Sequence, residues 1–510
     1  MAERTAPDGA AVDETAMDEV VRFTSDLIRI DTTNHGGGDC TERPAAEYVA
    51  GLLTEAGMEP VLLERAPGRT NVVARIEGTD PTETALLVHG HLDVVPAEPA
   101  DWTVHPFSGE VRDGVVWGRG AIDMKNMDAM VLSVLRSWAR TGARPRRDIV
   151  LAFTADEEDN GEYGSGFLAD RHPELFEGCT EGISESGAFT FHANGRRFYP
   201  IGAGERGTAW LRLTADGRAG HGSKVNRENA VSRLAGAVSR IGDHRWPVRI
   251  TPTVRAALTE LAAAHSIAAE LPADDPEALA RAVDALIAEL GPAGAIVQPT
   301  VRNSTNPTVL EAGYKINVIP GHATGFVDGR ILPGGEDEFR QTLDRLTGPY
   351  VDWEFHHREV PLQAPVDSPS FRAMREAVEH FDPGATAVPY CMSGGTDAKQ
   401  FSRLGIVGYG FSPLKLPEGF DYQALFHGVD ERVPVEALQF GVRALDRFLR
   451  NSTTARTGGG GPGSTELGGA APDGTAPGGT EPGGAEPGGT EPGGAEPGGA
   501  GAGAGAGGGT

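Results

Sequence analysis

Imidazole and carboxylate side chains that could bind metal ions follow several apolar segments of this chain. His91 and Asp93 come after the apolar run 85–89, and because they are two residues apart on an extended backbone, their side chains point the same way. One could bind a metal ion while the other holds the imidazole ring in place. Taken alone, such a pair is more often structural.

Three further carboxylates lie in similar places. Asp123 is in a glycine-flanked loop before a predicted helix, where it could bridge two cations or cap that helix. Glu157 and Glu158 are adjacent after the apolar run 149–153. One of them could bind metal while the other acts as a base toward water, although a solvated acidic turn is the simpler alternative for an isolated pair.

Glu185 in the sequence SESG and His427 in the sequence FHGVDE complete the set. Each is a weak signal by itself, since an isolated glutamate is usually a loop acid and an isolated histidine is usually structural. Packing does not explain the whole set, because protein cores rarely bury unpaired carboxylates. Together these residues predict a two-metal hydrolase site.

An α/β sheet is predicted to position these side chains. Apolar strands alternate with helices, which favours a sheet that is at least partly parallel. Ligands of such sheets bind beyond the carboxyl ends of the strands, where His91, Glu157 and Glu185 fall. The predicted strands are 71–76, 85–89, 148–154 and 182–184, and the predicted helices are 18–30, 44–56, 125–140 and 161–171.

A second, smaller unit is predicted to interrupt the first. From about residue 206 the pattern changes to a strand, a turn and a helix that begins near Asn226. We expect this α+β unit to span 206–360 and to carry a helical insertion near 269–290. Residues 15–205 and 361–450 then form one discontinuous mixed α/β catalytic domain. Further predicted elements are a strand at 351–357, a helix at 370–381, a strand at 406–411 and a helix at 434–449.

The composition changes abruptly in the last segment, 451–510, which is rich in Gly, Pro, Ala and Glu and repeats GGTEP or GGAEP. Such a sequence cannot bury enough apolar surface to offset its ordering entropy, so we expect a disordered tail. A role as a spacer or interaction segment is the alternative.

Charge and composition exclude several classes of protein. A formal net charge of -27 argues against nonspecific nucleic-acid binding, which requires clustered Lys and Arg. Three widely separated cysteines without CxxC spacing indicate neither a disulfide framework nor a thiolate zinc site. Without an apolar run of roughly 18 to 20 residues or a secretory signal, we expect a soluble, cytoplasmic protein that does not enter a membrane.

Residues from about 18 to 449 resemble the M20 metallopeptidase family, which contains glutamate carboxypeptidase, aminoacylase, acetylornithine deacetylase and succinyl-diaminopimelate desuccinylase relatives. The resemblance covers essentially the whole folded portion. The matching segments are HGHLDVVP at 89–96, GRGAIDMK at 118–125, TADEE at 154–158, GHGS at 220–223, NVIPG at 317–321, and SGGTDA and HGVDE near the end.

The resemblance implies two zinc ions and assigns their ligands. His91, Asp123 and Glu185 would hold one ion, and Asp123, Glu158 and His427 would hold the other, so that Asp123 bridges the pair. Cobalt or manganese could replace zinc, because carboxylate and imidazole ligands accept these metals too.

The same resemblance gives Asp93 and Glu157 different roles. Asp93 would orient His91, and Glu157 would be the general base that takes a proton from water and passes it to the leaving amine. The family often has a cis peptide after the bridging aspartate, which here would join Asp123 to Met124.

Substrate contacts are also implied by the resemblance, which makes residues 206–360 a lid and dimerisation domain. His221 would reach the site of a neighbouring subunit in a homodimer and donate to the oxyanion. Asn317 and Arg330 would hold polar substrate groups, and the planar fork of Arg330 suits a carboxylate. Gly394 and Gly395 would offer backbone N–H groups, although a plain turn is the alternative there.

The predicted activity is hydrolysis of an amide bond in a small molecule or short peptide, namely a dipeptide, a C-terminal residue or an N-acyl amino acid. A metal-binding or scaffolding protein that has lost catalysis is the alternative. The presence of Glu157 beside an intact ligand set favours an active enzyme. An interaction protein built around the tail is a third hypothesis.

Overall fold

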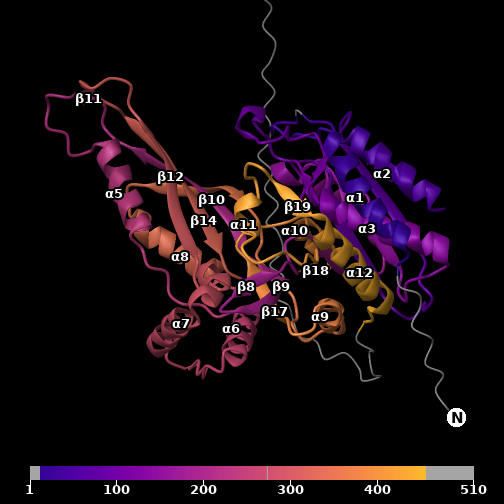
Figure 1. The fold of residues 1–510 in the computed structure, drawn as a ribbon. Helices are drawn as coiled ribbons and strands as arrows, with labels where there is room; N and C mark the ends of the chain where they lie inside the picture. Colours follow the sequence, from indigo (N-terminus) through magenta and orange to yellow (C-terminus); the bar gives the residue numbers. More distant parts are fainter. Residues whose placement is uncertain (1–11, 39, 273, 455–510) are drawn as a thin grey trace, which may run out of the picture. The chain divides into compact units, whose positions relative to one another are not determined.

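The computed structural model describes residues 12–38, 40–272 and 274–454 (Figure 1). A ten-stranded sheet has the order β1, β2, β6, β3, β7, β18, β9, β16, and β8 and β17 also pair with β9. β3, β6, β7 and β18 pair in parallel, which confirms the partly parallel sheet. The strands are β1 (Val61–Glu64), β2 (Thr70–Ile76), β3 (Ala85–His91), β6 (Ile149–Thr154), β7 (Cys179–Ser184), β8 (Phe191–Ala193), β9 (Arg196–Glu205), β16 (Leu362–Gln363), β17 (Thr386–Met392) and β18 (Val407–Gly410).

Strand β3 lies inside this sheet and is buried on both faces. Because side chains alternate along a strand, Leu86 and Val88 enter one hydrophobic core while Ala85 and Leu87 enter another. Burial on both faces is typical of parallel strands and explains why residues 85–88 are all apolar. The first core includes α1 (Glu14–Arg29), α2 (Arg43–Glu55), α3 (Lys125–Thr141), α9 (Pro369–Phe381) and α12 (Val435–Asn451), and the second includes α4 (Ser165–Arg171) and α10 (Ala398–Phe401).

Most of these helices end within two residues of the predicted positions, but α1 begins four residues earlier and α4 four residues later than predicted, and α10 was not predicted. At the start of α1, the Asp13 side chain accepts a hydrogen bond from the amide of Ala16 at 3.0 Å. At the end of α3, Gly142 adopts a left-handed conformation with φ of 74°, which is the common C-terminal stop.

A four-stranded antiparallel sheet is built from residues 207–358, in the order β12, β14, β10, β15. Leu211 and Leu213 of β10 enter its core together with side chains of α5 and α8, while Trp210 on the other face is 40% exposed. This one-sided burial is common in antiparallel sheets. Its elements are β10 (Gly207–Asp216), α5 (Ala230–Gly242), β12 (Ser304–Ala312), β14 (His322–Ile331), α8 (Glu336–Thr347) and β15 (Asp352–Arg358), and a separate ribbon pairs β11 (Gly220–His221) with β13 (Val318–Ile319).

The insertion contains more helix than the sequence predicted. Both α6 (Pro252–Ala264) and α7 (Pro276–Leu290) form, followed by the 3-10 turns η4 (Gly291–Ile296) and η5 (Gln298–Thr300). Their apolar side chains share a core with Val388 and Cys391 of β17 and Phe198 of β9. The insertion therefore packs on the ten-stranded sheet, although it lies within the predicted range 206–360; that division of the chain stays a prediction.

Short elements complete the described part of the chain. A three-stranded sheet pairs β5 (Val115–Trp117) with both β4 (Glu110–Arg112) and β19 (Arg432–Pro434). Other short helices are η1 (Pro99–Asp101), η2 (Glu157–Asp159), η3 (Pro173–Phe176), η6 (Ser402–Leu404) and α11 (Tyr422–Leu425). Helix α12 continues to Asn451, and the predicted tail from residue 455 lies outside the described residues. No helix in the described ranges has the length and apolar character to cross a membrane.

Candidate metal centre

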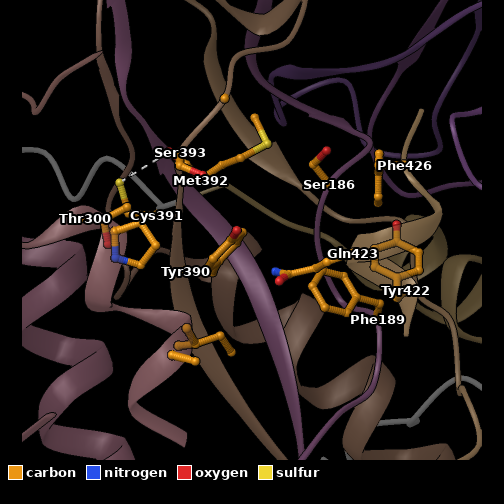
Figure 2. A pocket seen from close by; sticks show the side chains of 14 residues that line it. Ser186, Phe189, Thr300, Tyr390, Cys391, Met392, Ser393, Tyr422, Gln423 and Phe426 are labelled. Atoms are coloured by element: carbon orange, nitrogen blue, oxygen red, sulfur yellow. Dashed lines mark hydrogen bonds between the residues drawn. The ribbon is translucent and has the colours of Figure 1, made fainter. Parts of the chain in front are cut away.

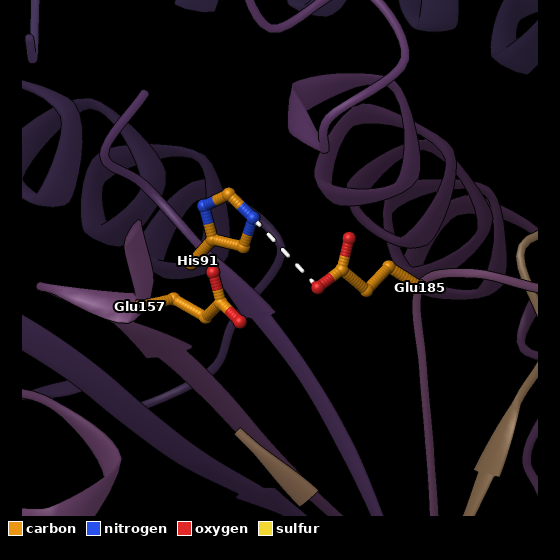
Figure 3. A group of neighbouring side chains, drawn as sticks. All are labelled: His91, Glu157 and Glu185. Atoms are coloured by element: carbon orange, nitrogen blue, oxygen red, sulfur yellow. Dashed lines mark ion pairs between the residues drawn. The ribbon is translucent and has the colours of Figure 1, made fainter. Parts of the chain in front are cut away.

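Three neighbouring strands bring His91, Glu157, Glu158 and Glu185 to one edge of the ten-stranded sheet. His91 is the last residue of β3, which pairs in parallel with β6 on one side and β7 on the other. Glu157 and Glu158 follow the end of β6, and Glu185 follows the end of β7. Figure 3 shows His91, Glu157 and Glu185 facing one another, and they can each place one ligand atom within 4.8 Å of the others.

Asp123 lies between two imidazole rings. One carboxylate oxygen, Oδ1, is 3.1 Å from Nε2 of His91, and the other, Oδ2, is 3.3 Å from Nε2 of His427. His427 Nε2 is also 3.1 Å from Oε2 of Glu158, and His91 Nε2 is 3.9 Å from Oε1 of Glu185. The five predicted ligands therefore converge, and Asp123 joins their two halves.

Asp93 positions its neighbours in two ways. Nδ1 of His91 donates to the backbone carbonyl of Asp93 at 2.9 Å, which leaves Nε2 of the neutral ring free to bind a cation. The Asp93 carboxylate accepts from the amides of Glu157 and Glu158 at 3.2 and 3.3 Å and from Asn34 at 2.9 Å. Asp93 thus fixes the acidic turn as well as the His91 ring, a second contact that the sequence did not predict.

Glu431 is a buried residue of this region for which the sequence analysis predicted no role. Its Oε1 accepts from the amides of Ile122 and Asp123 at 2.7 and 3.1 Å, and its Oε2 accepts from Arg119 at 2.7 Å. Arg119 also donates to the backbone carbonyl of His427 at 3.4 Å. Glu431 and Arg119, which we call the Glu431 clamp, therefore connect the segments that carry two predicted ligands. The only signal for Glu431 in the sequence was its position at the end of the HGVDE segment.

The backbone is unusual at both of these ligands. The peptide bond between Asp123 and Met124 is cis, as the resemblance implied. His427 has a φ of 55°, in the left-handed region that few residues other than glycine adopt. Surrounding contacts hold this conformation of His427, and the Glu431 clamp supplies one of them through the hydrogen bond from Arg119 to the His427 carbonyl.

Burial disfavours the ionised form of three carboxylates of the centre. Burial raises the pKa of Glu157 and Glu185 well above the ordinary value, and burial also raises the pKa of Glu158. Oε1 of Glu158 is buried and has no hydrogen-bond partner within the described part of the chain. A divalent cation would supply the missing positive charge.

The same group of carboxylates raises the pKa of both histidines of the centre. Hydrogen bonds to Asp123 and Glu158 raise the pKa of His427 to about 10. Burial alone would lower the pKa of His91, but its hydrogen bond to Asp123 and the nearby charges of Glu185 and Glu157 raise it well above the ordinary value. Cations that bind here would therefore displace protons from the imidazoles.

The predicted substrate-binding residues lie elsewhere. His221 and Asn317 are exposed, and the amide of Gly222 donates to the Asn317 carbonyl at 2.9 Å. The Arg330 guanidinium binds Asp328 at 2.8 Å. Within the described ranges, none of these three side chains has a hydrogen bond or ion pair with the metal-centre residues, and their roles stay predictions.

The two predicted glycines differ from each other. Gly394 lines a cavity, and a Cβ atom at this position would meet no atom within 4 Å. At Gly395 a Cβ atom would overlap Nζ of Lys399. A side chain at Gly395 would therefore displace the end of Lys399, which pairs with Glu359, and a contact of the Gly395 N–H group with substrate remains a prediction.

Comparisons with known proteins agree with this geometry. Residues 87–451, which include all the metal-centre residues, match the profile of peptidase family M20/M25/M40. The chain belongs to this family. It is therefore a hydrolase of amide bonds, as predicted.

Individual relatives of this M20 family member are moderately similar. The human N-fatty-acyl-amino acid synthase/hydrolase PM20D1 is 30% identical over 397 residues, which cover 74% of this chain and 76% of the relative. Pig aminoacylase-1 is 27% identical over 429 residues, covering 80% and 91%. The crystal structure of the M20 metallo-carboxypeptidase Sso-CP2 from Sulfolobus solfataricus matches with a TM-score of 0.63 and 20% identity, covering 85% of this chain and 99% of Sso-CP2. The last likeness confirms the mixed α/β fold.

Proposed function

We propose that this protein is a dinuclear metal hydrolase that cleaves the amide bond of N-acyl amino acids, with Glu157 as the general base. The observation that carries the proposal is the Asp123 carboxylate, which directs one oxygen toward His91 and the other toward His427. A carboxylate in this arrangement can serve two cations at once. The names of PM20D1 and aminoacylase-1 support N-acyl amino acids ahead of dipeptides or C-terminal residues.

The residues present fit a pair of divalent ions. His91, Asp123 and Glu185 would hold one ion, and Asp123, Glu158 and His427 would hold the other. Imidazole nitrogen and carboxylate oxygen suit zinc, and also cobalt or manganese. Oε1 of Glu158, which is buried without a hydrogen-bond partner among the described residues, would gain a partner from such an ion.

The chain's own groups then perform the proton transfers. When bound, the two ions supply Lewis acidity that lowers the pKa of water and polarises the amide carbonyl. Glu157 lies within reach of His91 and Glu185 but is not needed to complete either proposed ligand set. Its carboxylate accepts the proton of the attacking water and passes it to the leaving nitrogen, while Asp93 holds the Glu157 backbone in place.

The Glu157→Gln variant tests this assignment, because it keeps the size of the side chain and removes the base. We expect kcat for an N-acyl amino acid to fall about 100-fold to 10,000-fold, the usual range for loss of a general base. The content of bound metal, measured by mass spectrometry, should equal that of the wild type. Loss of one ion would instead make Glu157 a ligand.

The Glu162→Gln variant is a matched control for that experiment. Glu162 lies in the same turn, but its side chain is 63% exposed and pairs with Arg65 on the surface. We expect both turnover and metal content to stay at the wild-type level. A comparable loss of turnover in both variants would indicate damage to the turn and not the removal of a base.

A homodimer through residues 206–360 and a cytoplasmic location are further proposals. The exposed side chains of Val309 and Leu310 on the edge strand β12 support the first, because apolar edge strands often pair with another chain. Sedimentation of the purified protein would test the dimer.

A further inference from the structure

The insertion forms one wall of a cavity next to the metal centre. This cavity has a volume of about 360 Å³, within the usual range of small-molecule sites, and is lined by fourteen residues. Ile296 and Thr300 come from η4 and η5, and Tyr390 comes from β17. Figure 2 shows Phe189 and Tyr422 on the side opposite Tyr390. Segments far apart in the sequence therefore enclose one space.

Two residues that line the cavity are direct neighbours in the sequence of two predicted metal ligands. Ser186, which lines it, follows Glu185 directly, and Phe426, which also lines it, precedes His427. Tyr422, another lining residue, lies in α11 (Tyr422–Leu425), which ends two residues before His427. A substrate bound at the centre can therefore extend a substituent into this space.

The lining of the cavity is uncharged and largely apolar. None of the fourteen described lining residues is an aspartate, glutamate, lysine, arginine or histidine. The Phe189 and Tyr422 rings stack with their centroids 4.2 Å apart. An ionised group placed here would lose hydration without gaining a partner, whereas an apolar group would gain contact with these rings.

The wall supplied by the insertion is anchored firmly. Ile296 is 4% exposed and Val297 is 2% exposed, and both share a core with Val388 and Cys391 of β17. The guanidinium of Arg206 adds a hydrogen bond to the backbone carbonyl of Pro299 at 3.0 Å. The cavity therefore has a preformed shape, which is what a selective site requires.

We propose that this cavity is a specificity site, built by the insertion, that selects substrates by an uncharged apolar group attached next to the scissile amide. The assignment rests on the proposed amide hydrolysis and deepens it. The apolar group is either the acyl chain or the side chain of the amino acid, and two substrate series separate these sources.

The first experiment measures kcat/KM for both series with the metal-loaded, full-length protein. One series joins acetyl, butanoyl, octanoyl and dodecanoyl groups to glycine, and the other acetylates glycine, alanine, leucine and phenylalanine. We expect kcat/KM to rise in one series, by about fourfold for each buried methylene until the cavity is full. Flat values in both series would overturn the proposal.

Two variants test whether the cavity causes the preference for apolar groups. Gln423 and Ala295 are exposed lining residues, so substitution there should not disturb folding. We expect Gln423→Glu to lower kcat/KM for the most apolar substrate by about tenfold or more, because the new charge opposes apolar binding. The loss should be smaller for N-acetylglycine, which places no large apolar group in the cavity. Ala295→Trp should shift the preference toward smaller groups by filling the cavity.

The control variant is Gln298→Glu, which makes the same substitution in the insertion, whereas Gln423 lies in α11. Gln298 is exposed but does not line the cavity. We expect it to keep the wild-type preference in both substrate series. An equal loss in Gln298→Glu and Gln423→Glu would mean that an added negative charge lowers kcat/KM wherever it is placed, inside or outside the cavity, and would overturn the proposal.

A binding measurement separates this proposal from the proposed function. N-decylglycine and N-benzyl-phenylalanine have an amine where a substrate has its amide, so neither can be hydrolysed, and calorimetry reports their affinity directly. If no amide is cleaved but one of these probes binds and Gln423→Glu weakens its binding, the cavity assignment stands and amide hydrolysis is wrong. If neither affinity responds to Gln423→Glu, the cavity assignment is wrong even when amides are cleaved.

Discussion

At the scale of single residues, the predicted metal ligands and the base were easier to find in the sequence than the buried residues that hold the surrounding backbone. His91, Glu157 and Glu185 each follow a buried strand, so the sequence alone indicates that they meet at one sheet edge. Glu431 gave no such signal, because its contacts are to backbone amides, which no residue spacing reveals. Lys125 is similar: it is buried and its Nζ donates to the carbonyls of Leu27 and Ile30.

The Glu431 clamp makes a prediction about metal affinity. Glu431→Gln removes the charge that holds Arg119 and weakens the contacts to the Asp123 backbone. We expect zinc to bind about 10-fold to 100-fold more weakly, as is usual when a group that orients ligands is altered. Competition with a chromogenic chelator measures this change. Glu436→Gln, on the exposed side of α12, is the control, and equal zinc affinity in both variants would refute the role of the clamp.

At the scale of elements, strand ends and crossovers matter most. Strand β9 ends at Glu205, directly before β10 carries the chain into the four-stranded sheet. The Glu205 carboxylate accepts from the backbone amide and hydroxyl of Thr396 at 3.1 and 2.7 Å. These contacts fix the segment that carries Gly394 and Gly395 to the point where the chain changes sheet.

The contribution of Glu205 to the free energy of unfolding should depend on pH. Burial raises the pKa of Glu205 from 4.5 to about 6, although the charge of Lys399 opposes the shift. Because the pKa of Glu205 is higher in the folded protein than in the unfolded one, protonation of Glu205 stabilises the folded state. This stabilisation is complete below pH 4.5 and is lost as the pH rises through 6. We expect the free energy of unfolding to decrease by about 2 kcal/mol over this window relative to Glu205→Gln.

Urea denaturation of both proteins across that window measures this difference. The comparison with Glu205→Gln removes the contributions of all other groups that titrate there. Parallel stability curves for the two proteins would show that Glu205 has the same pKa in the folded and unfolded states.

The larger elements were predictable because their patterns are long and regular. Strands β3 and β6 carry continuous apolar runs, and α1 has a regular apolar face. The two-residue strands β11 and β13 are too short to leave a pattern. Helix α6 was missed although Thr251 and Pro252 at its start are ordinary helix signals. Its packing on β17 depends on contacts between distant segments, which the sequence alone does not contain.

At the scale of the whole molecule, the fold follows from the alternation of strands and helices, but its domain arrangement does not. The insertion lies between β10 and β12 of the four-stranded sheet in sequence, yet it packs on the ten-stranded sheet. The apolar pattern of residues 246–301 does not show which of the two sheets the insertion packs on. This choice matters for function, because it places Ile296 and Thr300 in the wall of the cavity.

The C-terminal segment provides a prediction at this scale. All residues of the metal centre lie between His91 and Glu431, and Thr454 still donates to Glu83 at 2.6 Å. We therefore expect removal of residues 455–510 to leave kcat/KM unchanged in a hydrolysis assay. A cut after residue 447 should instead destabilise the protein, because Phe448 and Leu449 are fully buried. Lost activity in the shorter deletion would give the tail a part in catalysis.

The pairing of β5 with β19 joins an early part of the chain to a late one, and this has a consequence for biogenesis. A ribosome that has reached residue 426 has already made Asp123 and Glu185, but not the second imidazole or the Glu431 clamp. A chain that stops there lacks these groups, so we expect it to bind divalent cations more weakly than the complete chain. Firm cation binding would thus require that the late segment has left the ribosome and docked.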